Sequence, residues 1–153
     1  MALGALGALA SCGSNATTGP VGSPLVGSYT LTQLESHFHG INTDHIAEGA
    51  RMTFELRKDG VAVVDVLIPN GQADGSDIRE TGETTWWFFT DIIEPNIRLT
   101  TIWLRTQTQV GVWGWRFDGY GLATSQPSCS LASFNPDILE CRFDAVLTKN
   151  PEG

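Results

Sequence analysis

The strongest constraint on this chain is the stretch Glu83–Leu122, which carries all five tryptophans of the sequence. Within residues 111–118, the aromatic side chains Trp113, Trp115 and Phe117 alternate with small or charged ones. A period of two is the pattern of a β-strand with one buried and one exposed face. The stretch therefore predicts strands whose aromatic faces supply much of a hydrophobic core.

Two further segments of this stretch also read as strands. Residues 96–106 alternate in the same way, and Gln107 and Thr108 join them to the following strand, which predicts a hairpin. Residues 84–90 carry large aromatic side chains on both parities, so neither face can be fully solvated. For this segment we predict that Trp86 and Phe88 face inward.

Composition limits the architecture and the partners. A chain of 153 residues with 41% hydrophobic content is long enough for one domain with a core and too short for two. Its 17 glycines and its charged content of 17% favour many short strands over long helices. A net charge of -8 leaves no basic surface for a phosphate backbone, so we expect no nucleic-acid partner.

The N-terminus carries an export motif. Residues 1–10 are a Leu/Ala/Gly run, shorter than the ~20 residues that span a bilayer, followed by Leu-Ala-Ser-Cys at 9–12. This arrangement resembles a bacterial lipoprotein signal, and the resemblance implies cleavage of residues 1–11 and acylation of Cys12. We therefore expect an exported protein held to the cell envelope by lipid alone. The alternative is a small-residue leader in which the cysteine occurs by chance.

The two remaining cysteines form an even pair. Residues 12–24 are rich in Gly, Ser, Thr, Asn and Pro and predict a flexible tether. With Cys12 assigned to lipid, Cys129 and Cys141 are predicted to form a disulfide in an oxidising compartment. The bond would contribute on the order of 3 kcal/mol by the chain-entropy model. A metal pair is the rival reading, but the sequence has no Cys-x-x-Cys to support it.

Histidines gather in one segment, residues 35–50. His37 and His39 would share a side of an extended chain, and His45 or Glu48 could complete an open zinc site. The alternative, which we favour, is a solvated loop with a short helix that starts near residue 42 or 43. We accordingly predict no cofactor. The sequence also has no Gly-x-Ser-x-Gly motif and no Ser/His/Asp set, so we predict no enzyme, with a metal-dependent activity as the residual possibility.

The first predicted strand resembles that of a known protein family. Residues 25–31 have the pattern Leu-x-Gly-x-aromatic-x-Leu, which resembles the opening strand of lipocalin-like proteins, with Tyr29 where that family usually has Trp. The resemblance implies that a basic side chain from the last strand covers this aromatic ring, and Arg142 is the matching candidate. Residues 51–68 add a hairpin with an Asp-Gly turn, and the chain is similar over about residues 25–149 to small bacterial lipoproteins with lipocalin-like domains, including uncharacterised actinobacterial ones.

Counting the alternating segments predicts an all-β fold. We expect an antiparallel up-and-down barrel of eight strands, lipocalin-like, with one short helix, and a β-sandwich as the alternative. The strands are expected near 26–33, 51–57, 60–68, 84–91, 96–106, 109–118, 121–131 and 140–149, with a loop at 69–83 and a tail at 150–153. We expect a monomer.

Two functions compete for such a barrel. In the first, a small apolar ligand enters a mouth lined by side chains drawn from Trp86, Trp103, Trp113, Trp115 and Phe117. In the second, the same aromatics fill the core, and the protein is an envelope interaction module, an inhibitor or immunity protein, that works through the acidic surface of residues 74–83.

Overall fold

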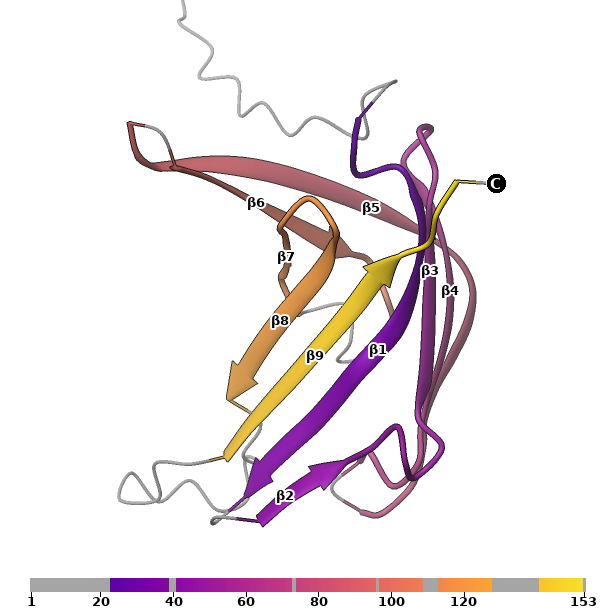
Figure 1. Ribbon diagram of the computed structural model, residues 1–153. Coiled ribbons are helices and arrows are strands. Elements are labelled where there is room, and N and C mark those ends of the chain that lie inside the picture. The colour runs from indigo at the N-terminus through magenta and orange to yellow at the C-terminus, as the bar shows by residue number, and fades with distance from the viewer. Residues whose placement is uncertain are drawn as a thin grey trace, which may run out of the picture.

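The protein is a closed antiparallel β-barrel of eight strands with one additional strand (Figure 1). This computed structural model describes residues 23–38, 41–72, 74–95, 97–108, 113–127 and 141–152. The strands are β1 Gly27–Phe38, β2 Ile41–Asp44, β3 Arg51–Leu56, β4 Val61–Ile68, β5 Ile78–Glu94, β6 Ile97–Leu104, β7 Trp115–Phe117, β8 Gly121–Pro127 and β9 Cys141–Lys149. Because β1 pairs with both β3 and β9, the sheet closes, which confirms the barrel and excludes the sandwich.

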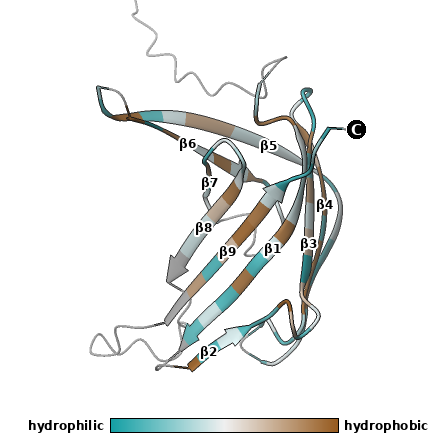
Figure 2. Ribbon diagram, viewed as in Figure 1, coloured by the Kyte–Doolittle hydropathy of each residue, from teal (hydrophilic) through white to brown (hydrophobic). Residues whose placement is uncertain are grey.

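Alternating burial along β3 and β4 accounts for the inner surface of the wall. Met52, Phe54 and Leu56 are buried, and the residues between them are exposed. The neighbouring strand β4 alternates between buried and half-buried residues, and hydrophobic and hydrophilic residues alternate visibly along β1 and β9 (Figure 2). The Asp-Gly turn joins these strands as predicted, with Gly60 at a positive φ of 83° that glycine adopts without steric cost. The alternation of the sequence therefore sets which side chains face the interior.

Large side chains fill the barrel. Tyr29, Phe54, Trp86 and Trp115 each expose 1% or less of their surface. The Phe54 and Trp115 rings meet edge to face at a centroid distance of 5.4 Å, a favourable geometry for aromatic pairs. Trp86 faces inward as predicted, with Phe88 packed beside it against the core.

A lysine, rather than the predicted arginine, lies beside Tyr29 at the end of the barrel. The β1–β9 register puts Arg142 opposite His37, at the far end of the strand from Tyr29, so the prediction for Arg142 is wrong. Lys149 is the residue opposite Tyr29, and its Nζ donates to the Pro24 carbonyl at 2.8 Å. A bulge in β1 between residues 31 and 33 shifts this register, and the sequence pattern does not reveal such a shift.

The predicted short helix is wrong. Over the described ranges the chain has no helix; residues 41–44 form β2, paired with β1, and residues 45–49 are turns. The Asp44 carboxylate accepts from the Ile46 amide at 2.9 Å, as a helix cap would. However, Gly49 follows at a φ of 96°, and β3 begins at Arg51, so the chain has no room for a second helical turn.

The longest strand, β5, runs past both ends of its predicted range. It begins at Ile78 rather than near residue 84, because Ile78–Thr85 pairs with all of β4. It also continues beyond its last β4 partner and pairs with β6, while β6 pairs with β7 only from Thr100 to Ile102. Residues 91–95 and 97–99, which we call the arm, therefore extend beyond the barrel wall as a two-stranded hairpin (Figure 1).

Candidate functional site

The five aromatic residues predicted to line a ligand mouth do not form one site. Trp86 and Trp115 lie in the core, and Trp113 and Phe117 are half-buried against it. Trp103 faces the opposite way, because its neighbours Ile102 and Leu104 are the buried residues of β6. The interior is therefore occupied by side chains, and Trp103 belongs to the outer surface.

Trp103 instead lines a groove of about 500 Å³ on the outside of the barrel. The groove crosses β6, β7, β8 and β9, and its lining side chains mostly have the outward parity of these strands. Its principal lining residues are Leu99, Thr101, Trp103, Gly114, Arg116, Ala123, Ser125, Asp144 and Val146.

The shortness of β7 explains why the groove forms there. Among the described strands, β7 pairs with β6 only as far as Ile102 and with β8 only at residues 116 and 117, so no described pairing connects β6 to β8 beyond this strand. Gly114 allows the close approach of Trp103, since a Cβ at this position would lie 3.1 Å from Cη2 of the indole. Arg116 and Asp144 add opposite charges to apolar walls. Such a lining suits a small aromatic or apolar molecule with one polar group.

A second, polar cleft of about 330 Å³ lies where β5 runs without a β6 partner. The Glu80 carboxylate reaches into it and accepts hydrogen bonds from the amides of Gln107 and Thr108, at 3.0 and 3.2 Å, and from the Thr108 hydroxyl. These bonds fasten residues 107 and 108 over the open part of the strand. The function of Glu80 here is to hold this segment in place.

The acidic surface predicted at residues 74–83 is largely engaged in local contacts. Asp77 accepts from the Asn70 amide at 3.1 Å and from Arg79 at 2.6 Å, and these interactions, the amide first, hold the pKa of its carboxyl below the ordinary value. Glu83 forms an ion pair with Arg57 at 2.9 Å. In addition, residues 78–83 belong to β5 rather than to a loop.

Two histidines lie in the described ranges, and they are on opposite sides of the sheet: His37 belongs to β1, and His45, in the turn after β2, contacts the other face of β1. His37 contacts Asn42 through Nδ1 at 2.7 Å and Asp144 through Nε2 at 3.1 Å. His45 contacts the Ser36 hydroxyl and stacks on the Phe143 ring, on the inward side. Within the described ranges no three His, Cys, Asp or Glu side chains are arranged to hold a metal ion, and His39 lies outside those ranges.

One arrangement was missed by sequence reasoning: Ser36, His45 and Glu48 lie in a row, with His45 between the other two. Nε2 of His45 lies 2.8 Å from the Ser36 hydroxyl, and Nδ1 lies 3.2 Å from a Glu48 carboxylate oxygen but makes no hydrogen bond to it. This is the order of a nucleophile, a base and an acid. However, Ser36 sits inside a strand paired on both sides, with Thr43 and Phe143 as its partners, so the amides around it belong to the sheet rather than to an oxyanion hole. The contacts brace the turn after β2 against the barrel.

The predicted lipidation and disulfide fall outside the part of the chain that is described. The structure describes neither Cys12 nor Cys129. Cys141 is the first residue of β9, but its side chain is not among those described. Acylation of Cys12 and a bond between Cys129 and Cys141 therefore stay predictions.

Comparisons with protein-family models, with curated proteins and with solved structures find no match to this chain. Among the residues that the structure describes, none form a helix with the length and hydrophobicity to cross a bilayer.

Proposed function

We propose that this chain is a lipid-anchored, extracytoplasmic bacterial protein whose lipocalin-like barrel binds a small apolar or aromatic ligand in the outer groove. The observation that carries the proposal is the groove itself, since its volume is within the usual range for ligand sites and Trp103 offers an aromatic wall. A packed interior supports the outer location, because eight-stranded barrels either hold one small ligand or are filled by side chains.

Ligand binding is tested with N-phenyl-1-naphthylamine, a neutral aromatic fluorophore. We expect saturable energy transfer from tryptophan to the probe in the parent chain and a large loss of affinity in Trp103→Ala. Trp87→Ala is the matched control, because Trp87 is the cross-strand partner of Trp103 but is not part of the groove lining. Transfer that does not saturate, or that is equal in both variants, would count against the groove.

The anchor is tested separately. The Leu-Ala-Ser-Cys motif at 9–12 supports it. In a bacterial host, we expect the full chain in the membrane fraction with a mass that corresponds to cleavage before Cys12 and acylation of it. Cys12→Ser should move the protein out of that fraction. An unmodified cysteine with residues 1–11 still attached would refute the anchor.

A second candidate function is that of an envelope interaction module, such as an inhibitor or an immunity protein. The filled core favours it, because the barrel would then act as a scaffold for surface contacts. The net charge of -8 suits a basic partner. We would use the chain as bait in extracts of the source envelope, and reproducible absence of a partner would remove this candidate.

A further inference from the structure

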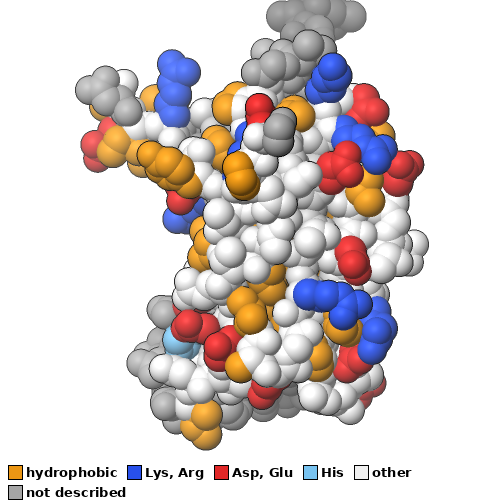
Figure 3. Space-filling view, turned by 45° about the vertical axis from the view of Figure 1, so that its right-hand side comes forward, with side chains coloured by type: hydrophobic (Ala, Val, Ile, Leu, Met, Phe, Trp, Pro, Cys, Tyr) orange, Lys and Arg blue, Asp and Glu red, His pale blue; other side chains and the backbone are white. Residues whose placement is uncertain are grey.

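The arm concentrates exposed hydrophobic surface. Three of the seven exposed large hydrophobic side chains in the described ranges belong to it, with exposed fractions from 51% to 69%. They are Ile92, Ile93 and Ile97, and a fourth, Phe89, lies at the base of the arm. In the space-filling view, hydrophobic side chains are visible on the protruding arm, with charged side chains near its tip (Figure 3). Contiguous exposed apolar surface of this kind marks a contact site.

The arm extends from the end of the barrel at which β1 begins. The β3–β4 turn lies at this end, since the Trp86 amide, in the part of β5 that leads into the arm, donates to the Gly60 carbonyl at 2.9 Å. The first residue of β1, Gly27, pairs with Leu56, the last residue before that same turn. The start of β1 and the base of the arm therefore lie at the same end of the barrel (Figure 1).

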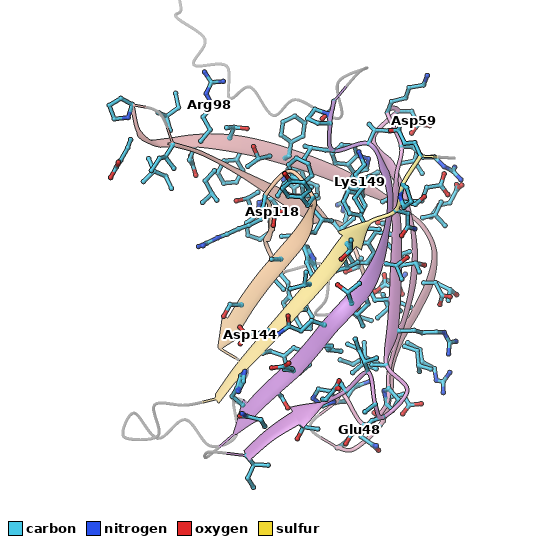
Figure 4. The ribbon with its side chains drawn as sticks, viewed as in Figure 1. Glu48, Asp59, Arg98, Asp118, Asp144 and Lys149 are labelled. Carbon is cyan, nitrogen blue, oxygen red and sulfur yellow. The ribbon has the colours of Figure 1, made fainter. Side chains whose placement is uncertain are left out.

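A further exposed aromatic residue lies at the same end. Tyr120, in the turn between β7 and β8, is 82% exposed, and its carbonyl accepts from the Lys149 amide at 2.9 Å. Figure 4 places Asp118, from this turn, and Lys149 toward the end that carries the arm, whereas Glu48 lies at the opposite end. Tyrosine is enriched where a protein meets the head-group region of a bilayer.

We propose that the arm and the Tyr120 turn rest on the surface of the bilayer to which the N-terminus is attached, with Ile92, Ile93 and Ile97 at the boundary between head groups and acyl chains. This inference rests on the proposed lipid anchor for its orientation. If residues 12–24 form the flexible tether that their composition predicts, its root-mean-square reach would be roughly 20 Å, which would keep the end of the barrel where β1 starts close to the membrane.

The unpaired backbone groups and the charges of the arm limit how deeply it can enter the bilayer. Among the described strands, none pairs with the outer edges of residues 87–94 or 97–99, so their free N–H and C=O groups need water and cannot enter the hydrocarbon. Asp91 and Glu94 outnumber Arg98 near the tip. The arm should therefore stay in the interface and prefer zwitterionic over anionic lipid.

The test uses a tryptophan reporter at each end of the barrel. Ile97→Trp places it on the arm, and Ile41→Trp is the matched control, because Ile41 is also an exposed strand isoleucine but lies in β2 at the far end. Each full chain, purified from bacterial membranes, is reconstituted in phosphatidylcholine vesicles with bromine on the upper acyl carbons. We expect the added emission of Ile97→Trp to be largely quenched and that of Ile41→Trp to be unaffected.

The outcomes test the membrane contact of the arm separately from the lipid anchor. Vesicle flotation with unquenched Ile97→Trp overturns the arm contact and leaves the anchor standing. Quenching without acylated Cys12 supports the arm and refutes the anchor. Equal quenching of both reporters overturns the orientation. An unquenched arm that cross-links to a second protein chain would show that a protein, rather than lipid, covers it.

Discussion

The two tryptophans at the centre of the barrel, Trp86 and Trp115, differ in the environment of their indole N–H groups. Nε1 of Trp86 donates to the Arg57 carbonyl at 2.8 Å. Nε1 of Trp115 is buried and has no hydrogen-bond partner among the described residues. A buried donor without a partner costs about 1–3 kcal/mol, so the two rings contribute differently to stability.

Substitution by phenylalanine should reveal this difference. Trp86→Phe and Trp115→Phe remove the same atoms from fully buried rings, but only the first breaks the bond to Arg57. We expect Trp86→Phe to lower the free energy of unfolding by about 1 kcal/mol more than Trp115→Phe. Urea denaturation of both variants measures the difference. Equal losses would mean that the Trp115 indole finds a partner in solution.

A carboxyl titration provides a second prediction at this scale. The Asn70 amide and Arg79 lower the pKa of Asp77 in the folded chain, so its contribution to stability is present above the unfolded pKa, about 3.9, and is lost as pH falls through the folded pKa. We expect the Asn70 amide resonance to titrate with a midpoint below that of an ordinary aspartate. The titration should vanish in Asp77→Asn, and a midpoint at the ordinary value would contradict the contact.

Side-chain orientation was predictable where alternation is unbroken. Met52, Phe54 and Leu56 face inward as their pattern requires. Trp103, one of the candidates for an inner lining, faces outward, because the adjacent apolar residues Ile102 and Leu104 share the buried parity. Size is a poor guide at a groove, where an outward ring can still be half-buried.

At the scale of elements, Glu80 fastens the segment after β6 to β5. Its three hydrogen bonds hold residues 107 and 108 where β6 no longer covers the strand. We expect Glu80→Ala to destabilise the fold by about 2 kcal/mol, because hydrogen bonds to a charged acceptor are lost. Glu83→Ala, which removes an exposed ion pair with Arg57, should cost less than about 1 kcal/mol. Thermal unfolding followed by circular dichroism separates the two, and equal melting temperatures would contradict this role for Glu80.

The extents of the elements were less predictable than their existence. The polar residues Arg79, Glu80 and Glu83 made the first part of β5 look like a loop, but pairing with β4 overrides their low strand propensity. β2 was not predicted because it has only four residues, most of them exposed, so its sequence shows no alternation of apolar and polar side chains. The prediction of a helix was wrong because it relied on a good capping residue, and a cap does not provide the length that a helix needs.

At the scale of the whole molecule, closure depends on one pairing that alternation cannot specify. β1 and β9 are separated by most of the chain, and their register contains a bulge. The groove and the arm also arise from unequal strand lengths, because β7 is short and β5 is long. The sequence could therefore indicate a barrel, whereas the site depends on where each pairing stops.

The arm lies outside the structure that closes the barrel, so it should be separable from stability. Replacing residues 91–99 with Asn-Gly would turn the chain directly after the Thr90–Thr100 pair and keep every β6–β7 partner. We expect the free energy of unfolding to stay within about 1 kcal/mol of the parent, because the removed side chains are mostly exposed and the shorter connection lowers the entropy cost of closure. Urea unfolding measures this change.

The same shortened chain bears on the membrane contact. If Ile92, Ile93 and Ile97 hold the arm to lipid, their removal should make the lipidated barrel tumble more freely on vesicles, which tryptophan anisotropy detects as a lower value than in the parent. The parent chain in detergent-free buffer without vesicles is the control for local motion. A large loss of stability would place the arm within the folding unit, and unchanged anisotropy would remove it from the membrane. Survival of the barrel together with freer tumbling would mean that the hairpin is exposed because its partner is the bilayer and not the rest of the chain.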